Sequence, residues 1–196
     1  MKKVFTTALF VSAFAYANAQ TVQVLDRCES LGSNPAHWYC DGASTKLNAD
    51  HKEGTYSVSS NHYKPERLRK IYEQPFNTGV TRDNGHIAFW LFVEKPELLN
   101  GIGQIVISSL AAASKDALSY NFSDLKPESG KLNAGWNHVI VPLKSFKGVV
   151  GTPDLAAVNY FRVLFYNKQD EVTPQEFKID NIRFSSDQTK LEATSK

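Results

Sequence analysis

The chain has 196 residues, of which 42% are hydrophobic, and 22 Lys and Arg residues face 20 Asp and Glu residues, for a formal net charge of +2. Lys2 and Lys3 lie in an N-terminal leader, so residues 20–196 carry a formal net charge of zero. Without a global positive field to attract phosphates, nucleic acid and anionic membranes are excluded as default partners. The 177 residues after the leader suit one domain with its own core.

The first 19 residues have the features of a secretory signal peptide. Residues 1–3 (MKK) are basic, residues 4–16 form an apolar run, and Ala17-Asn18-Ala19 supplies the small-x-small pattern of a cleavage site. We therefore expect cleavage after Ala19 and a secreted or periplasmic protein. No later stretch approaches 18 uncharged apolar residues, so no membrane span is predicted.

The rest of the chain is dominated by short segments with period-two alternation or with many β-branched and aromatic residues, which predict strands. They are residues 21–25, 55–60, 68–74, 87–93, 104–108, 118–122, 136–143, 159–166 and 177–184. Residues 110–117 and 152–157 each predict one helical turn. So many strands predict an all-β domain over residues 20–185, an antiparallel β-sandwich and most simply a jelly roll. Residues 186–196 add no further apolar strand and predict a disordered tail.

Cys28 and Cys40 are the two cysteines of the chain. Twelve positions apart in an exported protein, they predict a disulfide that ties the first strand to the following loop. A reactive thiol or a metal-binding pair is the alternative interpretation. The same loop carries Trp38 and Tyr39, which either form a recognition surface or plug the end of the sandwich.

The strand at residues 159–166 is the most informative for function. Phe161, Val163 and Phe165 alternate toward one side and predict a core face. The other side carries Tyr160, Arg162, Leu164 and Tyr166. Aromatic rings pack against the apolar faces of sugars, and a guanidinium binds a carboxylate or paired hydroxyls.

We therefore predict a glycan-binding cleft around Tyr160, Arg162 and Tyr166. Three further residues are predicted to border it, namely Tyr72, Trp90 and Arg69. An ordinary outer face, with its arginine held in a salt bridge, is the alternative.

Four segments together resemble jelly-roll carbohydrate-binding modules of the galactose-binding-like fold. Residues 52–58 (KEGTYSV), 135–143 (GWNHVIVPL) and 177–184 (FKIDNIRF) resemble the "EGxYSL", "GWNxVxVPL" and "IDNIRF" strands of these modules, and residues 85–91 (GHIAFWL) resemble "GxLxFWL". The resemblance spans nearly all of residues 20–185 in the expected order. It implies the sandwich fold and binding of a polysaccharide or oligosaccharide.

The resemblance also implies one structural calcium ion. In many of these modules the aspartate of the "IDN" motif is a calcium ligand, and the matching residue here is Asp180. Asp26 and Glu53 are the expected partners, because calcium takes six to eight oxygen ligands from carboxylates and carbonyls. The alternative is that Asp180 caps a turn or pairs with Arg183 or a lysine.

Catalytic readings remain open beside the binding one. Residues 65–69 (PERLR), 103–106 (GQIV) and 160–167 (YFRVLFYN) follow the order of the motifs of jelly-roll polysaccharide lyases of the alginate-lyase type. Val106 stands where those enzymes have a histidine, so the base that β-elimination needs is missing. No carboxylate pair for glycoside hydrolysis is evident. The sequence favours a non-catalytic carbohydrate-binding protein, with no catalytic residue assigned, over a lyase, a glycoside hydrolase or a structural protein of the cell envelope.

Overall fold

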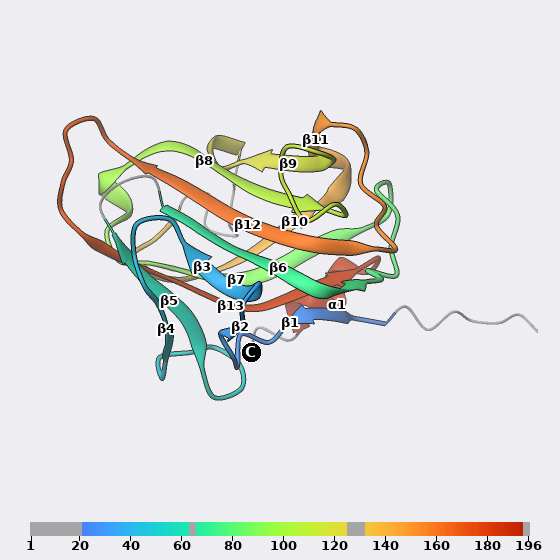
Figure 1. Ribbon diagram of the computed structural model, residues 1–196, viewed down its shortest axis with the longest axis horizontal. Coiled ribbons are helices and arrows are strands. Elements are labelled where there is room, and N and C mark those ends of the chain that lie inside the picture. The colour runs from blue at the N-terminus through green and yellow to red at the C-terminus, as the bar shows by residue number, and fades with distance from the viewer. Residues whose placement is uncertain (1–20, 63–65, 125–131, 194–196) are drawn as a thin grey trace, which may run out of the picture.

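The computed structural model describes residues 21–62, 66–124 and 132–193, so the predicted leader lies outside the described residues. The described chain is almost entirely β-structure. Two antiparallel sheets pack against each other in a jelly-roll β-sandwich, as the sequence predicts (Figure 1). Each strand of the sandwich has one side toward the core between the sheets and one side away from it.

The first sheet contains six strands. In spatial order these are β10 (Gly135–Pro142), β7 (His86–Val93), β13 (Gln175–Ser185), β5 (Ser57–His62) and β4 (Thr45–Asn48), with β1 (Gln23–Asp26) also paired to β13. Nearly every residue of β7 and β13 is buried. This burial agrees with the apolar character of β7 on both of its faces.

The second sheet has seven strands, with β12 near its centre. Their order is β11 (Lys147–Val150), β9 (Ala117–Asn121), β8 (Leu99–Ser108), β12 (Val158–Asn167), β6 (Glu66–Phe76), β3 (Ala36–Cys40) and β2 (Gly32–Ser33). Short 3₁₀ turns occur at Pro96–Leu98, Phe122–Asp124 and Leu143–Ser145. Figure 1 shows β8, β12 and β6 lying side by side.

The inward face of β12 anchors the core between the sheets. Phe161 meets Trp38 of β3 and Phe89 of β7 edge to face, with ring centroids 6.2 and 5.8 Å apart. Phe165 stacks on Phe177 of β13 at 4.5 Å. Both phenylalanines are buried, as the period-two pattern predicts.

An ion pair also crosses the core. Lys70 of β6 lies 2.8 Å from Asp26 of β1, and both side chains are largely buried. The Lys70 ammonium also lies over the rings of Trp38 and Tyr72, at 5.8 and 5.3 Å from their centroids. Because this pair joins the two sheets in a low-dielectric interior, removal of one partner would leave an uncompensated charge.

All nine predicted strands are present, and four short ones, β2, β3, β4 and β11, are additional. The helical turns predicted at residues 110–117 and 152–157 do not form.

The predicted disulfide is wrong, because Cys28 and Cys40 are both buried thiols that do not form a disulfide. Cys28 follows β1 of the first sheet, and burial raises the pKa of its thiol well above the usual value. Cys40 lies on β3 of the second sheet, where its sulfur accepts a hydrogen bond from Ser60 at 3.0 Å. Each cysteine therefore packs as a small apolar residue of the core.

The predicted disordered tail is corrected for residues 186–193, because α1 (Gln188–Ala193) folds against β13, and residues 194–196 lie outside the described residues. Asp187 begins it by accepting hydrogen bonds from the Thr189 amide and hydroxyl at 3.0 and 2.7 Å. Leu191 is fully buried, which supplies the apolar contact that holds so short a helix in place. None of the helices that the structure describes could span a membrane.

We predict that Leu191→Ala lowers the free energy of unfolding by about 2 to 5 kcal/mol, because it leaves a cavity beneath α1. Urea denaturation would measure the change. Val172→Ala is the matched control at an exposed position and should change stability by no more than about 0.5 kcal/mol. Equal stability of Leu191→Ala and wild type would show that α1 does not dock in solution.

Candidate functional site

The outer face of the second sheet carries a row of arginine and aromatic side chains. Arg162 of β12 lies directly opposite Arg69 of β6, and Arg69 lies opposite Tyr39 of β3. Directly paired residues point to the same side of an antiparallel sheet, so these three side chains share the outer surface. The next row places Leu164 opposite Arg67. We call this surface the arginine face.

Amide side chains continue the same face toward β8 and β9. Gln104 lies opposite Leu164 on one side and Asn121 on the other. Its amide donates to the Asn121 carbonyl oxygen at 3.5 Å. Val106 lies opposite Arg162 on β8 and is fully buried. The face therefore changes from cationic over β6 to amide-rich over β8 and β9.

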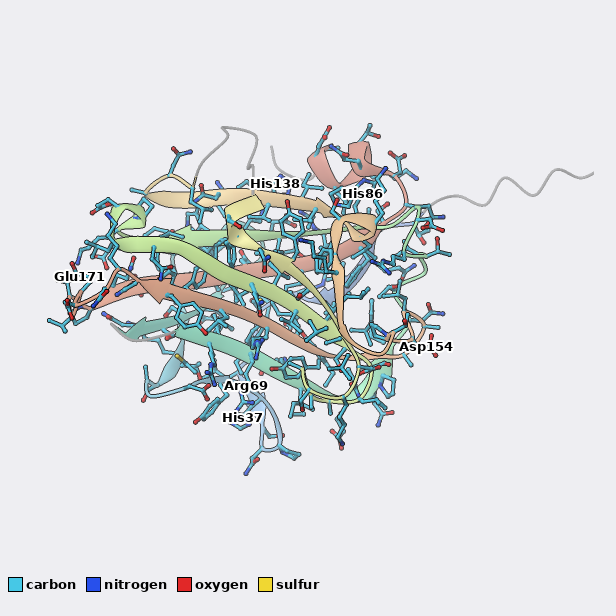
Figure 2. The ribbon with its side chains drawn as sticks, turned by 90° about the horizontal axis from the view of Figure 1, so that it is seen from above. His37, Arg69, His86, His138, Asp154 and Glu171 are labelled. Atoms are coloured by element: carbon cyan, nitrogen blue, oxygen red, sulfur yellow. The ribbon has the colours of Figure 1, made fainter. Side chains whose placement is uncertain are left out.

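Two cavities open on the arginine face. One, of about 260 Å³, is lined by Asn100, Gln104, Leu164 and Tyr166. The other, of about 280 Å³, is lined by Asn34, Pro35, His37, Tyr39, Arg69 and Ile71. The β2–β3 hairpin forms the rim of the second cavity, and His37 and Arg69 lie together there (Figure 2).

Tyr39 gives this face an accessible aromatic ring. Its side chain is 41% exposed, while its neighbour Trp38 is buried in the core. The Arg69 guanidinium lies 4.8 Å from the Tyr39 ring centroid, and the His37 ring meets Tyr39 edge to face. The sequence predicts that Trp38 and Tyr39 either form a recognition surface or plug the sandwich. Each prediction fits the position of one residue, because β3 directs Trp38 into the core and Tyr39 outward.

The three arginines differ in their partners. Asp41 pairs with both Arg67, at 3.1 Å, and Arg69, at 3.5 Å. Arg162 forms no ion pair with any residue that the structure describes, and its buried Nε has no hydrogen-bond partner among them. The outer-face salt bridge considered for Arg162 is therefore not formed within the described part of the chain.

Solved structures of similar fold include carbohydrate-binding modules. The family 11 module of the cellulosomal cellulase Lic26A-Cel5E of Clostridium thermocellum has a TM-score of 0.54 at 16% identity, covering 85% of this chain and 95% of that one. A family 11 module of the same organism, in complex with a β-1,3-1,4-mixed-linked tetrasaccharide, has 0.52 at 16%, with 83% and 94% covered. The family 30 module of its cellulase Cel9D-Cel44B has 0.52 at 11%, with 84% and 96% covered. This chain has the fold of a jelly-roll carbohydrate-binding module.

The resemblance seen in the sequence is thus confirmed at the level of the fold. No protein-family model matches the sequence, and no curated protein matches it. What the carbohydrate-binding-module fold does in this chain depends on its own side chains, because a shared fold does not fix a function.

Tyr160, predicted at the centre of the cleft, has no free ring face. It lies on the outer side of β12 but is only 2% exposed, packed with Val106, Ala117 and Ala113. Ala113 belongs to the β8–β9 loop, which folds over this end of the face. Ala111 of that loop donates a backbone hydrogen bond to the Asn159 side chain at 2.7 Å. The prediction of Tyr160 as a sugar platform is therefore corrected.

Trp90 and Tyr72 do not border the arginine face either. Tyr72 faces the core beside Lys70, where burial raises the pKa of its hydroxyl well above the usual value. Trp90 belongs to β7 of the first sheet and is only 7% exposed. Its ring stacks on His138 at 4.5 Å. His138 and Arg69 lie on opposite sides of the molecule in Figure 2.

The predicted calcium ligands are only partly brought together. Asp26 forms an ion pair with Lys70 and accepts a hydrogen bond from the Cys28 amide, so it does not join Glu53 and Asp180 in a shared metal site. Glu53 pairs with Arg183 at 3.2 Å, and Asp180 accepts hydrogen bonds through one oxygen from the Lys52 and Glu53 amides. Within the described ranges, no group of three or more His, Cys, Asp and Glu side chains is arranged to hold a metal ion.

Oxygen donors nevertheless gather around a cavity of about 20 Å³ that is lined by Arg27, Glu29, Glu53, Gly54 and Asn181. The second oxygen of Asp180 and the side-chain oxygen of Asn181 are buried without a hydrogen-bond partner among the described residues. Burial raises the pKa of Asp180, and the nearby Glu53 and Glu29 carboxylates add to that effect. Carboxylate and amide oxygens are the donors that calcium prefers, and the sequence prediction did not include Glu29 and Asn181, which line this cavity with Glu53.

His138, which stacks on Trp90, should make the stability of the protein depend on pH. Burial, with Arg183 and Lys52 nearby, lowers the pKa of His138 to about 4, although Glu192 opposes the shift. The unfolded chain therefore binds a proton at His138 below about pH 6.5 that the folded chain binds only near pH 4. We expect the free energy of unfolding to fall by about 3 kcal/mol as the pH decreases across that range.

His138→Gln should remove this part of the pH dependence. Urea denaturation between pH 4 and 7 would measure the slope for wild type and variant. Parallel curves for the two proteins would contradict a buried, neutral His138.

Proposed function

We propose that this chain is an exported, non-catalytic protein that binds a polysaccharide on its arginine face. The observation that carries the proposal is the exposed Tyr39 ring, stacked by Arg69 at the edge of a 280 Å³ cavity. Sugar recognition needs a flat apolar surface with planar hydrogen-bonding groups beside it, and Tyr39 and Arg69 supply both. The signal-peptide features of residues 1–19 support export.

The 260 Å³ cavity on the same face supplies groups of complementary chemistry. Asn100 and Gln104 carry amides that can donate to and accept from sugar hydroxyls, and Tyr166 adds a ring with a hydroxyl. The two cavities lie on one sheet face, so a polymer crossing the strands would contact both. A module of this fold from C. thermocellum has been solved in complex with a tetrasaccharide, which supports carbohydrate as the ligand class here.

The face lacks the base that a polysaccharide lyase would need at Val106. This residue is fully buried beside Ala117 and Tyr160, under the β8–β9 loop. The other elements of the lyase pattern, Arg69, Gln104 and Tyr166, do share the arginine face. Their arrangement suits binding of a chain, and β-elimination would require a base that this position does not provide.

We predict that Tyr39→Ala weakens polysaccharide binding about tenfold or more, because it removes the accessible ring and frees Arg69 from its stacked position. Affinity electrophoresis through gels containing a broad panel of neutral and acidic polysaccharides would measure binding as retarded migration.

Tyr56→Ala is the matched control, since Tyr56 is 39% exposed but lines neither cavity. Its retardation should equal that of wild type. Failure of wild type to be retarded by any polysaccharide would overturn the proposal and favour a structural role in the cell envelope.

We also propose that one calcium ion binds at Asp180, Glu53, Glu29 and Asn181 and stabilises the fold. Bound calcium would satisfy the buried oxygens of Asp180 and Asn181 and offset the repulsion among the three carboxylates. A ligand that binds only the folded state raises its stability in proportion to the logarithm of ligand concentration.

We predict that the melting temperature rises with added calcium and falls on chelation. Asp180→Asn should abolish the response, whereas Asp154→Asn, at an exposed loop position, should retain it. An unchanged melting temperature of wild type with and without calcium would exclude the site.

A further inference from the structure

We propose that the arginine face selects an acidic polysaccharide and binds its uronate carboxylates through Arg162 and Arg69. This inference rests on the proposed function and adds the chemical class of the ligand. It starts from the pairing of Arg162 directly opposite Arg69 on neighbouring strands. Like charges in directly opposed positions destabilise a sheet, so an anion bound at both guanidinium groups would relieve their repulsion.

The charges of the arginine face are not balanced among the residues that the structure describes. Arg67, Arg69 and Arg162 contribute three positive charges, and Asp41 contributes the one carboxylate that pairs with any of them in the described residues. These four side chains therefore carry a net charge of +2, in a chain whose residues 20–196 sum to zero. A neutral glycan would leave this excess in place, whereas an acidic glycan would neutralise it.

The apolar surroundings of Arg162 strengthen the interaction between its guanidinium and a bound anion. Tyr160 precedes and Leu164 follows it on the same side of β12, and Val106 lies opposite it, all three of them buried. Arg162 is itself half-buried, and its Nε lacks a partner among the described residues. Apolar neighbours reduce screening by water, so a charge-assisted bond at this guanidinium is stronger than one in open solvent.

Asp41 indicates which anion suits the face. A single carboxylate there contacts two guanidinium groups, through one oxygen to Arg67 and through the other to Arg69. A uronate carboxylate can bridge Arg162 and Arg69 in the way that Asp41 bridges Arg67 and Arg69, and the planar fork of each arginine suits carboxylate oxygens. The arginine face should therefore prefer carboxylated to sulfated polysaccharides.

The test compares matched polymers in affinity gels: polygalacturonate and alginate, methyl-esterified polygalacturonate, a neutral β-glucan and dextran sulfate. We expect retardation by the two uronate polymers, little by the methyl ester, and weaker binding of the uronates as sodium chloride is raised. Arg162→Met should reduce uronate affinity about tenfold or more. Lys46→Gln, which removes an exposed charge from β4 of the other sheet, should leave it unchanged.

Each alternative outcome has a distinct meaning. Retardation by β-glucan but not by uronates would overturn the acidic class and leave the proposed function standing. Equal retardation by uronates and dextran sulfate would overturn the carboxylate assignment. Absence of retardation by every polymer would refute the proposed function itself.

The melting temperature of Arg162→Met separates loss of binding from loss of folding. Because the substitution removes one of two opposed like charges and an unpartnered buried donor, the variant should melt no lower than wild type. A variant that melts lower and binds uronates normally would contradict the proposed role of Arg162. The salt dependence of wild-type binding tests the inference without any substitution.

Discussion

The register of β12 determines both the core and the candidate site. This strand pairs with β6 on one side and β8 on the other, so its alternate residues face either the first sheet or the outer surface. Within the sandwich, Phe161 contacts aromatic rings of β3 and β7, and Phe165 contacts rings of β13 and of the 3₁₀ turn between β9 and β10. Arg162 points away from the core. A slip by one residue would bury Arg162 and expose the phenylalanines, so burial of these rings fixes the position of the arginine.

This dependence explains what the sequence could predict. Period-two alternation and β-branched or aromatic enrichment located nine of the strands and the two faces of residues 159–166, because burial on one side of a strand leaves a local pattern. It also placed Arg162 and Tyr166 on the outer side. The position of Arg69 opposite Arg162, by contrast, follows from pairing between strands about ninety residues apart in the chain, which no local pattern records.

The errors have the same origin in long-range structure. Tyr160 is on the predicted side of β12, but its exposure depends on the β8–β9 loop, which is held over it by Asp116 and Asn159. Trp90 lies in an apolar segment of the sequence, but only the order of strands in the sheets shows that it belongs to the first sheet and not to the sheet of Arg162. Cys28 and Cys40 are close in sequence but attach to different sheets. The sequence predicts Tyr39 in a loop, whereas it lies on the short strand β3, which directs its ring outward.

The two outer faces of the sandwich differ in whether their cationic side chains are paired with carboxylates. On the first sheet, Lys178 of β13 pairs with Asp50 and Glu176, and Arg183 pairs with Glu53, so cations and carboxylates there are matched inside the protein. On the second sheet, Arg162 has no such match among the described residues, and Arg69 shares its carboxylate with Arg67. A chain with zero net charge over residues 20–196 thus keeps a local positive excess on one face. This excess lies on the face that carries both cavities, where a bound anionic ligand would neutralise it.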